Sequence, residues 1–226
     1  MYDRLEVVTI DGPCGVGKST ISRKLAARMH FTYLDTGAMY RAVALKCKQE
    51  EVDVADEAAV IPLLENLDLQ LLPALSEKED VRVLLDGKDV SDQIRTPEIS
   101  MMASAVSALP SVRKCLTMMQ QELGSSGKIV AEGRDTGTIV FPRAAWKFYL
   151  DATTEERVRR RINQMRNGGQ EVDDEEILAQ IRKRDRDDSE RAIAPLKAAP
   201  DAVLVDSTRL GIDEVIEHMH GIIKKK

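Results

Sequence analysis

Short apolar runs alternate with longer segments of helical periodicity along most of the chain. The run at 5–10 is rich in β-branched residues and stops at Asp11-Gly12, which is typical of a strand buried in a parallel sheet. Four later runs have the same character and lie at 31–34, 128–131, 146–150 and 202–205. Helix-length segments separate the runs, and this alternation predicts an α/β fold with a doubly wound, five-stranded parallel sheet.

The interval 67–90 breaks this rhythm. Residues 67–71 and 81–84 alternate between apolar and polar positions, as half-exposed strands do, and Asp86-Gly87 favours a hairpin turn. We therefore expect a small antiparallel β insert attached to the main sheet. A surface hairpin with no role in substrate binding is the alternative.

Composition narrows the class of protein. The 226 residues are 43% hydrophobic, which is ordinary for a globular domain with a sizeable core. No stretch approaches the roughly 18 apolar residues of a membrane helix, and the N-terminal residues lack a signal peptide's pattern, so we expect a cytoplasmic protein that binds no membrane. The cysteines, Cys14, Cys47 and Cys115, fit neither a disulfide framework nor a zinc site. A net charge of -5 gives no reason to expect nucleic-acid binding.

A glycine-rich turn joins the first strand to a helical segment, and it has the form of a phosphate-binding loop, or P-loop. It consists of Gly12, Pro13, Cys14, Gly15, Val16, Gly17, Lys18 and Ser19. Its backbone N–H groups can point at a phosphate, next to the positive end of the helix. Lys18 is expected to reach the β- and γ-phosphates, and the Ser19 hydroxyl to bind Mg²⁺. Both flanking elements are present, which disfavours an accidental match.

The P-loop identifies a phosphate donor and leaves the acceptor open, because GTPases, motor ATPases and small-molecule kinases share it. A guanine-nucleotide switch also needs an Asn-Lys-x-Asp motif, and the sequence contains none. Arginines are instead frequent near the ends of predicted strands. Phosphoryl transfer brings two polyanions together and needs several cations, so this distribution favours a kinase.

The first arginine cluster lies at 35–41. Thr36 can cap a new helix, and Arg41 lies about one turn into it. A helix start with an arginine suits a monophosphate. An ordinary capped helix with a solvated arginine is an equally good interpretation of this segment alone.

The second cluster lies at 132–137, directly after a predicted strand. Ligands of open α/β sheets bind at the carboxyl ends of the strands, so Arg134 and Asp135 are candidate ligand contacts. A structural salt bridge within this loop is the alternative.

The third cluster is an arginine-dense helical region. Two sets of residues each share one helical face: Arg157, Arg160 and Arg161 in one set, and Arg184, Asp188 and Arg191 in the other. Charge runs are usually solvated helix faces, and neighbouring acidic residues could pair with these arginines. The charge pattern alone favours that interpretation over a binding role.

Taken together, four segments closely resemble those of the bacterial cytidylate kinases, in the same order and across nearly the whole chain. They lie at 11–20, 34–41, 132–138 and 184–191, with further similarity at 89–98 and 194–196. The resemblance implies transfer of the γ-phosphoryl group of ATP to CMP or dCMP, which yields ADP and CDP or dCDP, in pyrimidine nucleotide metabolism. It also implies one P-loop kinase domain over 1–226, with a core at about 1–62 and 96–226, a nucleoside-monophosphate (NMP)-binding insert at about 63–95 and a short helical lid at about 155–191.

The resemblance also assigns roles to single residues. Lys18, Arg134 and Arg184 are the implied catalytic cations. The ATP site takes in the P-loop with Thr20, Arg157 and Arg160. The implied ligands of the acceptor phosphate are Thr36, Arg41 and Arg134, with Arg184 and Arg191 beside it. The cytosine ring is expected to contact Ser104, Arg113 and Asp135. Asp188 is expected to bind the pentose hydroxyls. Thr36 stands where many relatives have serine. The acceptor phosphate is already anionic near neutral pH, so no strong general base is needed.

Two other functions remain as alternatives. A similar P-loop kinase acting on UMP, AMP or a small metabolite would keep Lys18 and differ at Asp135 and Arg113. A regulatory protein that binds ATP without catalysis would leave the acceptor-side arginines without a purpose. We expect a monomer whose partners are ATP, CMP and dCMP, with Mg²⁺ as cofactor.

Overall fold

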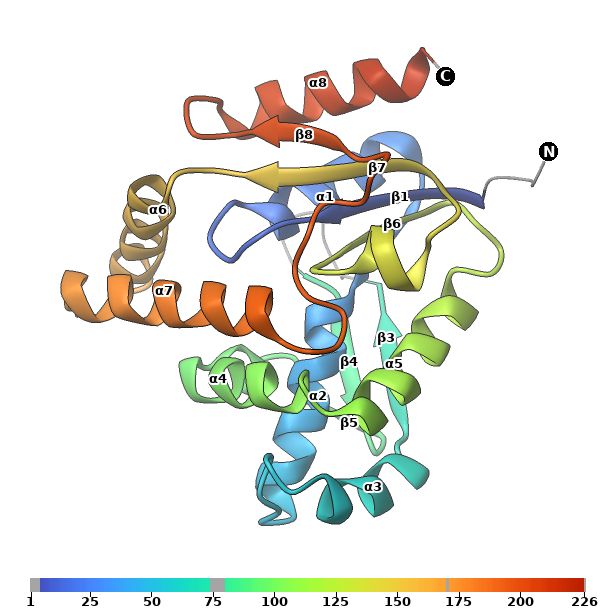
Figure 1. The fold of residues 1–226 in the computed structure, drawn as a ribbon, viewed down its shortest axis with the longest axis vertical. Helices are drawn as coiled ribbons and strands as arrows, with labels where there is room; N and C mark the ends of the chain where they lie inside the picture. The colour runs from blue at the N-terminus through green and yellow to red at the C-terminus, as the bar shows by residue number, and fades with distance from the viewer. Residues whose placement is uncertain (1–4, 74–79, 170, 226) are drawn as a thin grey trace.

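The computed structural model describes residues 5–73, 80–169 and 171–225. Five parallel strands form its central sheet, in the order β2-β6-β1-β7-β8 (Figure 1). The bounds are β1 Leu5–Asp11, β2 Thr32–Asp35, β6 Ile129–Gly133, β7 Ala144–Asp151 and β8 Val203–Asp206. Each strand agrees with its predicted run to within two residues, and the predicted α/β class is confirmed. Because β1 is the central strand, the loop that follows it lies at the middle of the sheet's carboxyl edge.

Alternating side chains on the strands build a core on each face of the sheet. Val8 and Ile10 of β1 pack in one core with residues of α1 Lys18–Met29 and α8 Ile212–Lys224. Val7 points to the opposite face and packs with residues of α2 Thr36–Gln49 and α5 Pro110–Leu123. Burial on both faces explains why these strands are continuous apolar runs in the sequence.

The predicted antiparallel insert is a three-stranded sheet in the order β3-β4-β5. Its strands are β3 Leu69–Leu72, β4 Arg82–Leu85 and β5 Lys88–Asp89, and residues 74–79 of the predicted insert lie outside the described residues. Asp86 and Gly87 form the turn between β4 and β5 with φ of 50° and 75°, which is the conformation that an Asp-Gly hairpin favours.

The small sheet shares its core with α2. Val83 and Leu85 lie in the same apolar cluster as the helix residues. The buried Lys46 of α2 donates hydrogen bonds to the Asp86 carboxylate at 2.9 Å and to the Asn66 carbonyl at 3.2 Å. The neighbouring elements are α3 Glu57–Glu65, η1 Gln93–Arg95 and α4 Pro97–Val106.

Two further helices lie beside the carboxyl edge of the main sheet (Figure 1). They are α6 Thr154–Asn167 and α7 Asp174–Glu190, which coincide with the arginine-dense region. Ile162 of α6 packs against Ile177 and Ile181 of α7 in a small separate core. The two helices therefore form a unit with its own packing. A membrane-spanning helix, long and apolar enough to cross a bilayer, does not occur among the described residues.

Candidate active site

The P-loop connects β1 to α1 and approaches other backbone closely. Gly12 has φ of 151°, and a Cβ at this position would lie 2.0 Å from the carbonyl oxygen of Leu150 on β7. Gly15 has φ of 81°, and a Cβ there would lie 3.1 Å from the Cβ of Arg157. Glycine is needed at both positions for conformation and for space. The sequence pattern therefore marks a loop that is packed tightly between β7 and α6.

Lys18 turns back over the P-loop. Its Nζ donates hydrogen bonds to the carbonyl oxygens of Gly12 at 2.8 Å and Pro13 at 2.6 Å. Burial, followed by repulsion from Arg134, lowers the pKa of Lys18 to about 7. A nucleotide phosphate would favour the charged form, because a nearby anion stabilises an ammonium group.

Two predicted ATP-site arginines hold the P-loop from outside. Arg157 is buried, donates to the Cys14 carbonyl at 3.2 Å and forms an ion pair with Asp185 of α7 at 2.7 Å. Arg160 donates to the Val16 carbonyl at 3.3 Å and to the Ser207 carbonyl at 2.6 Å. These bonds join the loop to α6, α7 and the segment after β8.

The start of α2 differs from the prediction. Asp35 caps the helix by accepting a hydrogen bond from the Ala38 N–H at 2.9 Å, and Thr36 is the first helical residue. The expectation that Thr36 caps this helix was wrong, because the last residue of β2 already supplies the carboxylate. The Thr36 hydroxyl donates to the Glu132 carbonyl at 2.7 Å, and Arg41 forms an ion pair with Asp35 at 2.9 Å.

Asp11 fixes the loop that follows β6. Its carboxylate accepts hydrogen bonds from the Thr136 N–H at 2.9 Å, the Thr136 hydroxyl at 2.7 Å and the Gly137 N–H at 2.8 Å. Burial raises the pKa of Asp11 in spite of these bonds. The loop carries Arg134 and Asp135. The last residue of β1 therefore helps to fix the loop that holds two candidate site residues.

Arg134 and Arg184 meet at Asp188. Arg134 donates from Nε to the Asp188 carboxylate at 2.7 Å. Burial opposes the charge on Arg134, but the attraction and hydrogen bond to Asp188, together with the charges of Cys14 and Glu132, outweigh it and raise the arginine's pKa. Burial also opposes ionisation of Asp188, and the charges of Arg134 and Arg184 overcome it, so the pKa of Asp188 is lowered. Burial, and then Arg134, lowers the pKa of Arg184.

Asp135 lies between two arginines. Arg113 forms a buried ion pair with one of its carboxylate oxygens, and Arg191 approaches the other at 3.4 Å. Arg113 also donates to the Ser107 carbonyl at 2.9 Å, and its guanidinium lies 5.6 Å from the centroid of the Tyr40 ring. Helix α7 ends at Glu190, so Arg191 is the first residue after it. The helical face that was predicted for Arg184, Asp188 and Arg191 therefore does not extend to Arg191.

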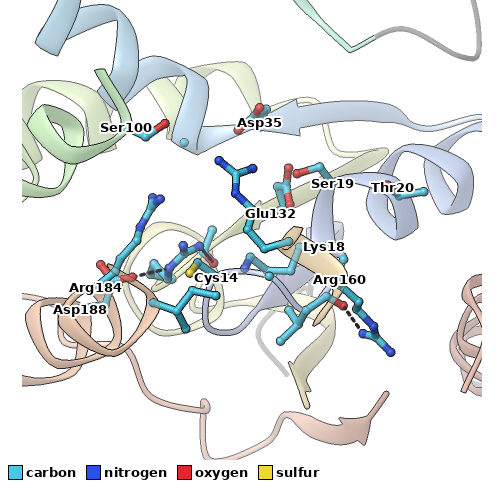
Figure 2. A pocket seen from close by; sticks show the side chains of 18 of the residues that line it. Cys14, Lys18, Ser19, Thr20, Asp35, Ser100, Glu132, Arg160, Arg184 and Asp188 are labelled. Carbon is cyan, nitrogen blue, oxygen red and sulfur yellow. Dashed lines mark hydrogen bonds and ion pairs between the residues drawn. The ribbon is translucent and has the colours of Figure 1, made fainter. Parts of the chain in front are cut away.

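Most of these groups line one cleft of about 960 Å³. Figure 2 shows Ser19 and Glu132 on one side of it, Arg184 and Asp188 on the other, and Lys18 between them. The predicted site residues that line the cleft are Cys14, Gly15, Val16, Gly17, Lys18, Ser19, Thr20, Thr36, Arg41, Ser104, Arg134, Asp135, Arg160, Arg184, Asp188 and Arg191. Gly12, Pro13, Arg113 and Arg157 are not among the lining residues of the described chain; they lie behind it.

Several charged groups of the cleft have an incomplete set of hydrogen bonds. The Nε atoms of Arg41 and Arg184 are buried and make no hydrogen bond within the described part of the chain. Leaving such donors unpaired is costly, and a phosphate oxygen is a strong acceptor. The arrangement fits the binding of an anion between α2 and α7.

The donor side also fits a magnesium ion. Ser19 lines the cleft, and its hydroxyl lies next to the Glu132 carboxylate (Figure 2). Both are hard oxygen donors, and Mg²⁺ is usually held by one or two protein oxygens together with substrate phosphates and water.

Sequence analysis missed several residues of the cleft. Glu132, Asp35 and Tyr40 lie within the segments 132–138 and 34–41, but the sequence predicted no function for them. Glu132 and Asp35 each lie at or next to the end of a buried strand, and this position was the available signal. Asp80 was also missed, and it forms ion pairs with Arg23 of α1 at 2.5 Å and with Arg95 of η1 at 2.7 Å.

Comparison with known proteins identifies related sequences. The family model described as cytidylate kinase matches residues 8–225. A cytidylate kinase of Pasteurella multocida is 48% identical over 219 residues, which cover 97% of this chain and 95% of that protein. A cytidylate kinase of Carboxydothermus hydrogenoformans is 46% identical over 219 residues, with 97% of each chain covered. A crystal structure of an uncharacterized protein from Eubacterium ventriosum has a TM-score of 0.54 at 11% identity, covers 99% of this chain and 100% of that one, and shows a similar fold.

Proposed function

The chain belongs to the cytidylate kinase family, and we propose that it transfers the γ-phosphoryl group of ATP to CMP and dCMP, with ADP and CDP or dCDP as products. The observation that carries this proposal is the convergence, in one cleft, of a P-loop and a separate set of arginines on the acceptor side. The P-loop suits the donor, and the arginines suit a second phosphate.

The donor half is the P-loop with the residues that brace it. Its backbone from Gly12 to Thr20 would hold the phosphates of ATP, and Lys18 would leave the loop carbonyls to reach the β- and γ-phosphates. Arg160 lines the cleft and would contact ATP, whereas Arg157 would act by holding the Cys14 carbonyl. Ser19 would bind Mg²⁺, which would supply positive charge to the phosphates of ATP.

The acceptor half lies between α2, the loop after β6 and α7. Thr36, Arg41, Arg134 and Arg184 would bind the acceptor phosphate, and Arg191 would lie beside it. The cytosine ring would contact Ser104 and Asp135, and Arg113, which lies behind the cleft, would take part in base recognition through its ion pair with Asp135. Asp188 would bind the pentose hydroxyls.

The reaction requires positioning and charge stabilisation. An oxygen of the acceptor phosphate attacks the γ-phosphorus of ATP, a new P–O bond forms, and the bond to the β-phosphate oxygen breaks, so that ADP leaves with the electron pair. Lys18, Arg134 and Arg184 would stabilise the charge that spreads over the transferred group. The attacking oxygen is anionic near neutral pH, so no side chain needs to remove a proton.

Helices α6 and α7 would form a lid that closes over ATP, which excludes water and suppresses hydrolysis. Their separate core and their contacts with the P-loop support this role. The same proposal includes a core at about 1–62 and 96–226, the NMP-binding insert at about 63–95 and the lid at about 155–191. We further propose that the protein acts as a monomer in the cytoplasm.

A coupled assay of ADP release tests the proposal when CMP, dCMP, UMP and AMP are offered separately. We expect the two cytidine nucleotides to react far faster than the others. Equal turnover of AMP would refute the assignment, and ATP binding without turnover of any acceptor would favour a regulatory protein.

A further inference from the structure

A tyrosine that no motif includes lies close to the donor side of the cleft. Tyr33 of β2 pairs with Val130 of β6, and Asp35 pairs with Glu132 two positions later. Side chains two residues apart on a strand share a face. Val130 and Tyr33 both pack in the core that α1 covers, so Glu132 also faces α1. Ser19, the second residue of α1, belongs to the same helix.

Hydrogen bonds connect these side chains. The Tyr33 hydroxyl donates to Oε1 of Glu132. The Glu132 carboxylate also lies next to the Ser19 side chain at the edge of the cleft, as Figure 2 shows, where it can accept a hydrogen bond from the serine hydroxyl. Glu132 is only 4% exposed, so its carboxylate depends on protein groups for hydrogen bonds. A chain of contacts therefore runs from the sheet to the P-loop serine.

The direction of these bonds determines what Ser19 presents to the cleft. An ionised carboxylate accepts and does not donate, so a Ser19 hydroxyl that bonds to it directs its hydrogen at Glu132. The lone pairs of the serine oxygen are then directed away from Glu132, where a cation could use them. A serine that rotated freely would have to be ordered again for each cation that binds.

Burial, followed by the charge of Glu132, raises the pKa of Tyr33 well above its usual range, so the hydroxyl keeps its proton and remains a donor. Its bond to Oε1 restrains the orientation of the Glu132 carboxylate. Without it, the carboxylate could turn about its side-chain bonds.

We propose that Tyr33 is a positioning residue for the cation that accompanies ATP: it fixes Glu132, and Glu132 orients the Ser19 hydroxyl. The proposal rests on the proposed function only in that ATP binds at the P-loop with a divalent cation. Groups that orient metal ligands typically change metal affinity by 10- to 100-fold when they are removed.

Tyr33→Phe tests this role, because it keeps the ring in the core and removes only the hydroxyl. Calorimetry would measure the affinity for ATP in excess Mg²⁺ and in EDTA, and the ratio of the two affinities measures how much Mg²⁺ strengthens binding. We expect Tyr33→Phe to reduce this ratio about tenfold and to change the affinity in EDTA less than twofold. A purely structural role would change both affinities together.

Two further variants sharpen the test. Tyr149→Phe removes a hydroxyl from β7, outside the residues that line the cleft, and should leave the ratio unchanged. In a Ser19→Ala background, Tyr33→Phe should have no further effect on the ratio, because the two residues act through one path.

The proposal is overturned if Tyr33→Phe leaves the ratio intact, if its effect persists in the Ser19→Ala background, or if Mg²⁺ does not strengthen ATP binding in the unmodified protein. No acceptor nucleotide is present in these binding measurements. A protein that fails to phosphorylate CMP would therefore refute the proposed function and still give a result for Tyr33.

Discussion

Arg134 donates from Nε to the carboxylate of Asp188 across 2.7 Å, and this ion pair joins the loop after β6 to helix α7. Arg134 is proposed to hold the acceptor phosphate, and α7 is part of the proposed lid. A residue that is proposed to bind the acceptor phosphate is thus in direct contact with the proposed lid.

Replacement of Arg134 tests the catalytic proposal. We expect Arg134→Ala to lower kcat/KM for CMP by on the order of 10³, because a preorganised charge contact to the reacting phosphate is worth several kcal/mol. ATP affinity, measured separately by calorimetry, should stay nearly the same. Activity close to that of the unmodified protein would mean that Arg134 serves only the ion pair with Asp188.

Asp135 should govern both selectivity and stability. Asp135→Asn removes the charge that pairs with the buried Arg113, and loss of one partner of a buried pair typically costs about 3 to 5 kcal/mol. We also expect the preference for CMP over UMP to fall. A carboxylate can only accept a hydrogen bond from the base, whereas the Asn side-chain amide can also donate one. Urea unfolding and competing-substrate kinetics measure the two effects.

A second substitution separates these two effects. Asp135→Asn combined with Arg113→Met should regain part of the free energy of unfolding, because the buried Arg113 charge that Asp135 paired with is removed as well. It should not regain selectivity. Wild-type CMP/UMP selectivity in Asp135→Asn would exclude Asp135 from base recognition.

Glu132 should make stability depend on pH. Burial, and then the charge of Asp35, raises the pKa of Glu132 from 4.5 to about 7. A raised folded-state pKa gives stability that is present below pH 4.5 and lost as pH rises through 7. The free energy of unfolding of the nucleotide-free protein, relative to Glu132→Gln, should therefore fall by up to about 3 kcal/mol between these values. Urea unfolding at several pH values measures this difference, and a constant difference would contradict it.

Lys18 should take up a proton when ATP binds. Its pKa of about 7 leaves the side chain mostly neutral at pH 8, and the phosphates should restore the charge. We expect uptake approaching about one proton, measured by calorimetry at pH 8 in buffers of different ionisation enthalpy. Lys18→Gln should abolish the dependence on the buffer. Binding with no such dependence in the unmodified protein would show that Lys18 is already charged.

The sequence predicted the main sheet well because burial on both faces leaves continuous apolar runs, as at β1 and β6. The P-loop was equally clear, since Gly12 and Gly15 have both conformational and steric reasons to be glycine. Asp86-Gly87 likewise predicted its hairpin.

The errors and omissions each have a physical cause. Thr36 was expected to cap α2 because threonine is a good cap, but Asp35 lies one residue earlier and competes for the same N–H groups. The bond between Tyr33 and Glu132 joins residues 99 positions apart, and only strand pairing brings them together. Arg157 gave a charge pattern typical of a solvated face, and the structure instead buries it against the P-loop.

Lys46 fastens the small sheet to the far part of α2, while Thr36 and Arg41 lie at the start of the same helix. A helix of this length is stiff, so a displacement at one end is transmitted to the other. Thr36 directly follows β2 and is held to the main sheet by its hydrogen bond to Glu132, so a displacement of the small sheet should tilt α2 about this end and move Arg41 relative to the P-loop. The position of Arg41 in the cleft would then depend on what the small sheet contacts.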